Sequence, residues 1–183
     1  MNEDKQIHIP EPKIAKFLFT DTRFAWFWLL VRLYIGYEWL VAGIGKATSP
    51  VWTGSQAGTA IKGFLLGSLE KTSGAHPDVS SWYAFFVENL ALPHPVLFSY
   101  LITYGEIAVG VALILGIFVG ISAFFGSFMN MNFLMAGAVS SNPILLFLQL
   151  FLILAWRTAG WIGLDHFILK ALGAKHKGLL PKD

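Results

Sequence analysis

The sequence predicts an all-α integral membrane protein: a four-transmembrane-helix bundle with two short amphipathic helices in the long outer loop between the first two spans. Three observations predict this class. The 183 residues are 55% apolar and only 13% charged, with a mean hydropathy of +0.61, whereas a soluble domain carries about 25% charged residues. The apolar residues form four long runs, and the eight prolines all lie outside these runs.

The four expected spans follow from their lengths. Crossing about 30 Å of hydrocarbon takes about 20 apolar residues in a helix. The runs that qualify cover residues 24–45, 96–118, 119–139 and 144–162. Because the second and third runs are continuous, we expect a tight hairpin near Gly116–Gly120. A single helix through both runs would overrun the bilayer about twofold.

Lysine and arginine residues predict how the chain is oriented. They gather in the N-terminal tail and after the fourth run, whereas the connection 47–95 carries only two lysines. The positive-inside rule then places both termini in the cytoplasm and the connection outside. The polar N-terminus is not typical of a signal peptide, so we expect a multi-pass protein of the cell membrane that retains its first span. The expected divisions are a cytoplasmic tail (1–23), the membrane domain (24–173) and a basic cytoplasmic tail (174–183).

The 47–95 connection contains two stretches with apolar residues at helical spacing. The first has Ile61, Phe64, Leu65 and Leu69, and the second has Val79, Trp82, Tyr83, Phe86 and Leu90. Asp78 is a candidate cap for the second stretch. Two interpretations stay open: the helices anchor the loop at the membrane interface, or they form a lid over a site that opens to the outer leaflet.

Polar residues inside the spans are the candidates for function, because a charge at the bilayer centre costs about 3 kcal/mol even on lenient scales. They are Arg32, Glu38, Glu106, Asn130, Asn132 and Gln149. Arg32, Glu106 and Asn130 lie near the midpoints of their expected spans, so we predict that Arg32 faces Glu106 in one polar layer. A purely structural role, fixing the register of the helices, is the alternative.

Helical spacing also predicts which faces meet inside the bundle. One stripe of the first span carries Arg32, Gly36, Trp39, Gly43 and Lys46, and small residues on such a stripe let membrane helices approach closely. Glu38 lies about 120° away around the same helix. It is expected to reach a second partner, Lys46 included, or to face a water-filled outer pocket.

Missing residue types exclude several chemistries. The chain has no cysteine, so we expect no iron–sulfur cluster and no Cys-ligated zinc. The five histidines lie outside the expected spans, so we expect no haem in the bundle and no other metal site. The net charge of +2 and the apolar composition also speak against a nucleic-acid partner.

A series of motifs follows through the membrane domain. These are Arg32-x3-Gly36 … Gly43-x2-Lys46, Pro50-x-Trp52-x-Gly54, Lys62-Gly63-Phe64-Leu65, His76-Pro77, Gly105-Glu106-x3-Gly110 … Leu115-Gly116, Asn130-x-Asn132-Phe133 and Gly160-x2-Gly163-Leu164-Asp165. In this order and spacing they resemble the DoxX/DoxD family over about residues 24–173. That family includes the small DoxD subunit of thiosulfate:quinone oxidoreductase. The resemblance implies a four-helix membrane bundle that is linked to redox partners.

The resemblance and the polar residues lead to a first functional hypothesis, a membrane subunit of a quinone-linked oxidoreductase acting on thiosulfate or another small sulfur compound. Arg32, Glu106 and Glu38 are the expected catalytic residues, the two carboxyl groups passing protons. Lys46, Trp39, Trp52, Asn130, Asn132 and Gln149 are the expected substrate-binding residues. Tyr34 and Tyr104 are further candidate donors to the quinone, and Lys46 with Trp52 would attract an anionic reductant.

A second hypothesis is a non-catalytic membrane adaptor, or a subunit that binds a small solute and recruits redox partners. It rests on the absence from the sequence of a redox group of the chain's own. The expected partners are membrane lipid, quinone and a redox partner subunit, with a homo-oligomer as a further possibility. A transporter is the third candidate, although four spans without a repeat make a poor single-chain transporter.

Overall fold

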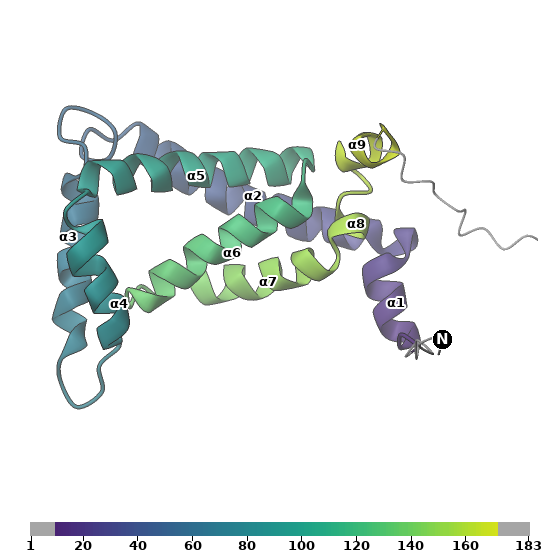
Figure 1. Cartoon of the computed structure of the whole chain (residues 1–183). Helices are drawn as coiled ribbons and strands as arrows, with labels where there is room; N and C mark the ends of the chain where they lie inside the picture. Colours follow the sequence, from purple (N-terminus) through teal and green to yellow (C-terminus); the bar gives the residue numbers. More distant parts are fainter. Residues whose placement is uncertain (1–9, 172–183) are drawn as a thin grey trace, which may run out of the picture.

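The computed structural model describes residues 10–171, and every regular element in this part of the chain is helical. The predicted basic tail (174–183) and residues 1–9 lie outside the described residues. Figure 1 labels the helices. They are α1 (Lys13–Thr20), η1 (Thr22–Phe24), α2 (Ala25–Ala47), α3 (Thr59–Leu69), η2 (Glu70–Thr72), α4 (Ser81–Phe86), η3 (Val87–Ala91), α5 (Pro95–Leu115), α6 (Val119–Met135), α7 (Asn142–Leu154), α8 (Trp156–Ala159) and α9 (Asp165–Ala171).

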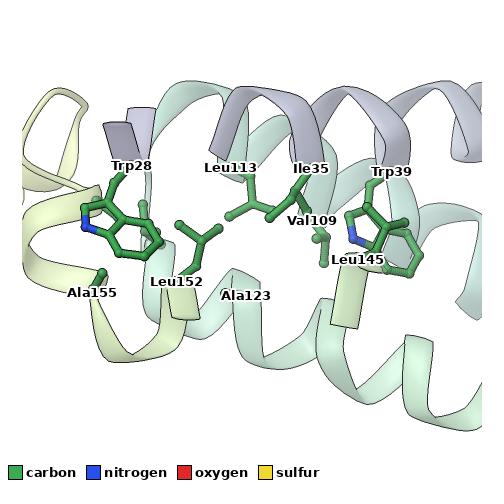
Figure 2. Close-up of a cluster of buried hydrophobic side chains, with 11 residues drawn as sticks. Trp28, Ile35, Trp39, Val109, Leu113, Ala123, Leu145, Leu152 and Ala155 are labelled. Atoms are coloured by element: carbon green, nitrogen blue, oxygen red, sulfur yellow. The ribbon is translucent and has the colours of Figure 1, made fainter. Parts of the chain in front are cut away.

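Four helices pack around one core. α2 packs against α5 and α7, and α6 packs against the same two helices. The core between them is apolar and aromatic, and Figure 2 shows Trp28 and Trp39 at its two ends with Ile35, Leu113 and Leu152 between them. The outer faces of the same helices are also apolar, since Trp26, Phe124 and Phe147 are more than half exposed. A protein with apolar residues both inside and outside suits a lipid surrounding.

Two of the described helices are long and apolar enough to cross a membrane, Thr22–Ala47 and Pro95–Leu115. The third and fourth apolar runs form shorter helices, so the predicted spans 119–139 and 144–162 are too long. α6 stops because Gly137 adopts a left-handed conformation (φ 73°), and the amide of Ala138 donates to Phe133 O in a Schellman-type ending. α7 stops at Ala155, after which α8 turns to pack against α1 and α2.

The predicted hairpin between the second and third runs is confirmed. α5 ends at Leu115 and α6 begins at Val119. Gly116 (φ 69°) and Phe118 (φ 47°) both take left-handed backbone conformations in this short turn, which glycine adopts freely and phenylalanine does not. Figure 1 shows α6 leaving the hairpin at an angle, so that α5 and α6 diverge toward α3 and α4.

Glycines set the close approach of α2 and α5. A Cβ on Gly43 would lie 2.8 Å from the amide nitrogen of Ile107, and a Cβ on Gly110 would lie 2.6 Å from that of Leu40. Neither backbone has room for the extra atom. The predicted stripe of small residues on α2 therefore does face the interior, and it fixes the register of α2 against α5.

The two predicted helices of the 47–95 connection are present as α3 and as α4 with η3. They lie across the end of the bundle in Figure 1 and bury Ile61, Leu65, Tyr83 and Val87 to 5% exposure or less. Asp78 does not cap the second helix, because Ser80 occupies the N-cap position and no side chain bonds the helix start there.

Side chains of these connection helices also hold the end of α6. Lys71 Nζ donates to Gly137 O over 2.7 Å, and Tyr83 Oη donates to Asn132 O over 2.9 Å. Both acceptors are carbonyls near the C-terminus of α6; Asn132 O also accepts from the amide of Ala136, so Tyr83 adds a second hydrogen bond there. The connection helices are thus packed and bonded as a cover on the bundle end.

Candidate functional site

The ion pair inside the bundle joins Lys46 to Glu106, not Arg32 to Glu106. Lys46 Nζ lies 2.7 Å from Glu106 Oε2, and the side chains are 21% and 2% exposed. The predicted Arg32–Glu106 contact is therefore wrong.

The register of the two helices explains this correction. α2 and α5 run antiparallel, and their glycine contacts place Gly43 opposite Glu106 and Ile107. Lys46 is one turn beyond Gly43, so its side chain reaches back to Glu106. Arg32 precedes Lys46 by 14 residues, which is about 21 Å along the helix axis. Arg32 and Glu106 consequently lie at different depths, and the single polar layer does not exist.

Arg32 instead joins α2 to the far end of the bundle. Its guanidinium is 1% exposed, and Nη2 donates to Ile162 O over 2.8 Å. Nη1 lies so close to Gly116 and Gly163 that a Cβ at either position would collide with it. The backbones of Gly116 and Gly163 therefore pack closely against the guanidinium. The surroundings of Arg32 favour a structural role.

Asp165 forms hydrogen bonds at this end of the bundle that the sequence did not predict. Its Oδ1 accepts from the amide of Phe118 over 2.6 Å, and its Oδ2 accepts from Val119 over 2.9 Å. A carboxylate on the first amides of α6 is favoured by the unpaired N–H groups and by the helix dipole. The same carboxylate supplies the negative charge that acts on Arg32. The available signal was the Gly160-x2-Gly163-Leu164-Asp165 motif.

Five of the nine predicted site residues line one cavity of about 270 Å³, here called the polar pocket. They are Glu38, Trp39, Lys46, Trp52 and Glu106. Phe64, Phe133, Ser141 and Asn142 are among the remaining lining residues. Of the two alternatives for Glu38, a second partner such as Lys46 or a position on a pocket, the structure shows that Glu38 lines this pocket and gives it no bond to Lys46 among the described residues.

The polar pocket combines charges with aromatic walls. Lys46 Nζ lies 5.2 Å from the centre of the Trp52 ring, within range of a cation–π interaction. Glu106 holds the same ammonium from the other side. Of the three N–H groups on Lys46, the ion pair uses one. A cation with spare donors can bind an oxygen-bearing ligand, and a second carboxyl group that lines the same cavity, Glu38, can exchange protons with that ligand.

Asn130 and Gln149 form a separate polar contact in the core. Asn130 Nδ2 donates to Gln149 Oε1 over 2.8 Å, and both side chains are fully buried. Gly126 leaves room for the Gln149 amide, and Trp39 Nε1 lies against the same glycine. The pair adjoins the polar pocket through Trp39, but neither amide lines it.

The remaining predicted residues lie away from the polar pocket. Asn132 Nδ2 bonds Phe128 O within its own helix, and its side chain lines a second, apolar cavity. Tyr34 and Tyr104 are 45% and 54% exposed on the outside of the bundle. These tyrosines therefore do not stand beside the ion pair.

The comparison with protein families agrees with the motifs. The family model described as DoxX matches residues 27–139, more than half of the chain, and this region includes Glu38, Lys46 and Glu106. The chain matches no curated protein and no solved structure. The likeness to DoxD in particular stays a prediction. The match over α2 to α6 and the apolar helices agree with a membrane location, and the chain belongs to the DoxX family, a membrane family associated with oxidoreductase-related functions.

Proposed function

We propose that this chain is the membrane subunit of a quinone-linked oxidoreductase, and that the polar pocket binds the quinone head group. The observation that carries the proposal is the Lys46–Glu106 ion pair. The two paired residues line one cavity together with Glu38 and several aromatic rings. A quinone head is a flat apolar ring with carbonyl oxygens that need hydrogen-bond donors. The pocket offers matching chemistry: aromatic walls for the ring and an ammonium for a carbonyl.

Each charged residue of the polar pocket has its own role in the proposal. Lys46 donates a hydrogen bond to a quinone carbonyl, and Glu106 holds the ammonium in place for it. Glu38, which is partly exposed, exchanges protons between the pocket and the outer aqueous phase. Reduction of a bound quinone to quinol consumes two electrons and two protons. Arg32 has no part in this proposal, because its guanidinium lies at the other end of the bundle.

Electrons come from outside this chain in the proposal. The donor is a redox partner subunit or a small sulfur compound such as thiosulfate. Lys46 and Trp52 line the cavity together with the carboxyl groups of Glu38 and Glu106. Because these carboxyl groups oppose an anion, the proposal favours a redox partner subunit as the donor. A non-catalytic adaptor that recruits redox partners is the alternative outcome of the binding test below.

The proposal includes a topology in which α2, α5, α6 and α7 all cross the membrane, with both termini in the cytoplasm. α6 and α7 are short for a span, but they pack along each other, and α6 also contacts α5. The lack of cysteines makes the topology testable with single introduced cysteines. We expect Ser73→Cys to react with an impermeant maleimide in intact cells. Lys13→Cys and Lys170→Cys should react only after permeabilisation, and the reverse pattern would refute the orientation.

Quinone binding is tested with the purified chain in detergent. A tailless benzoquinone should quench tryptophan fluorescence, since Trp39 and Trp52 line the pocket. We expect Lys46→Arg to keep the ion pair but alter the geometry of donation, and Glu38→Gln to leave binding intact while removing the proton-exchanging group. Lys46→Met should weaken binding about tenfold, equivalent to about 1.4 kcal/mol.

Lys62→Met is the matched control, because Lys62 is exposed on α3 and does not line the pocket. Its binding should equal that of the parent chain. If the parent chain does not bind quinone, the oxidoreductase proposal fails and the adaptor becomes the better explanation.

A further inference from the structure

A second cavity adjoins the polar pocket and differs from it in character. It has a volume of about 330 Å³ and lies between α5 and α6 beneath α3, α4 and η3. Apart from Tyr83 and Asn132, its lining is apolar. We call it the apolar cavity. Its size lies at the lower end of the roughly 300–1,000 Å³ typical of ligand sites.

The two cavities share a wall. Ile61, Phe64 and Phe133 line both of them. The Phe133 ring lies 6.4 Å from the centre of Trp39 and 6.2 Å from that of Phe64, so it stands between the polar side and the connection helix. Joining the two spaces into one elongated site requires a side chain of this shared wall, such as Phe133, to move.

The rim of the apolar cavity faces the surroundings of the bundle. Leu101 of α5 and Phe128 of α6 line it and are each 60% exposed. Both residues belong to α5 and α6, the two helices that diverge from their hairpin in Figure 1. In a membrane this opening adjoins lipid, because the outward faces of both helices are apolar.

We propose that the apolar cavity holds the isoprenoid tail of the quinone whose head occupies the polar pocket, and that the tail enters sideways from the membrane between α5 and α6. This inference rests on the proposed function. The wall that it shares with the polar pocket selects this occupant over a lipid acyl chain, because only a ligand with both a tail and a head group of matching chemistry would use both spaces. The tail gains little from leaving lipid, so its packing against the lining decides its binding.

The test uses a benzoquinone with a short tail that ends in a photoreactive diazirine, bound to the full chain in lipid nanodiscs. Peptide mass spectrometry then locates the label. We expect it on cavity-lining residues such as Phe98, Ile102 and Met129, with excess tailless benzoquinone displacing it. Leu101→Trp, which fills the rim, should reduce the labelling of these residues about tenfold.

Leu97→Trp is the matched control. Leu97 lies one turn before Leu101 on the same face of α5, is 59% exposed and does not line the cavity. It should label like the parent chain. Label on α2 or α7, or cavity label that tailless benzoquinone does not displace, overturns the inference while quinone binding in the polar pocket stands. Failure of tailless benzoquinone to bind at all removes the proposed function and the inference with it.

Discussion

Lys46 and Glu106 form an ion pair whose two partners are unequally buried. They lie 60 residues apart in the chain and 2.7 Å apart in space. The lysine side chain is 21% exposed, whereas the glutamate side chain is 2% exposed. The carboxylate depends on the ammonium, because α2 and α5 leave it almost no contact with the surroundings. The ammonium has an alternative, because about a fifth of the lysine side chain stays exposed. This asymmetry makes the two residues differ in what their removal costs.

We predict that Lys46→Met destabilises the chain more than Glu106→Gln does. Removing one partner of a buried pair costs about 3–5 kcal/mol, because the other charge is left buried without compensation. Lys46→Met leaves Glu106 in that state and should approach this range. Glu106→Gln leaves a partly exposed lysine that keeps an amide oxygen as acceptor, so the loss should be smaller. Denaturant titration in mild detergent gives the two free energies of unfolding.

The double variant Lys46→Met/Glu106→Gln serves as control for this prediction. It removes both charges, so it should recover much of the stability that Lys46→Met loses. Equal losses from the two single variants, or a double variant that merely adds them, would contradict the asymmetry of the pair.

α2 illustrates how much of the structure the sequence could predict. The spacing of Arg32, Gly36 and Lys46 correctly assigned them to one inward face, because a helical period depends on local geometry alone. The depth of each residue was less predictable. Placing Arg32 beside Glu106 assumed that each apolar run is centred in the bilayer, whereas contacts of Gly43 and Gly110 decide the register.

Long-range contacts account for the other omissions. Asp165 reaches the first amides of α6 only because the chain after α8 returns to the α5–α6 hairpin. No local pattern encodes that return. The convergence of Glu38, Trp52 and Glu106 on one pocket likewise needs the connection helices folded over the bundle end, although each residue was recognisable as a polar or aromatic candidate.

Asp165→Ala should destabilise the chain. The stability of Asp165→Asn should lie between that of the parent chain and that of Asp165→Ala. The carboxylate satisfies two amides, those of Phe118 and Val119, and an asparagine can accept through one oxygen. An unsatisfied buried donor costs about 1–3 kcal/mol. Thermal unfolding of the purified variants gives the order. Asp78→Asn is the control, since Asp78 is exposed and its side chain does not bond the start of α4; an equal effect at both positions would refute a special role for Asp165.

Tyr83 should make stability depend on pH in the alkaline range. Burial raises the pKa of its hydroxyl from 10.0 to about 12, so the folded state favours the neutral phenol that bonds Asn132 O. This contribution is fully present below pH 10 and is lost as the pH rises from 10 to 12, because the unfolded state releases the proton first. At pH 8, Tyr83→Phe should cost about 1 kcal/mol.

The measurement is denaturant unfolding at pH 8 and pH 11. The stability difference between the parent chain and Tyr83→Phe should shrink at the higher pH, and a constant difference would count against the linkage. Tyr37→Phe is the control, because Tyr37 is 60% exposed on the outside of α2.

Gly43→Ala and Gly45→Ala should change stability in opposite directions although the two positions lie two residues apart in α2. A Cβ on Gly43 would meet the backbone of Ile107 at 2.8 Å, whereas a Cβ on Gly45 would meet nothing within 4 Å. The first substitution must push α2 and α5 apart, and overpacking of this kind costs about 1–3 kcal/mol. The second removes a flexible residue from a helix and should stabilise the chain by about 0.5–1 kcal/mol.

Displacing α2 also moves Lys46 from Glu106, so Gly43→Ala alone should weaken the binding of tailless benzoquinone. If Gly45→Ala lowered the stability of the chain, or if Gly43→Ala did not lower it, the glycine contacts would not set the register on which the polar pocket depends.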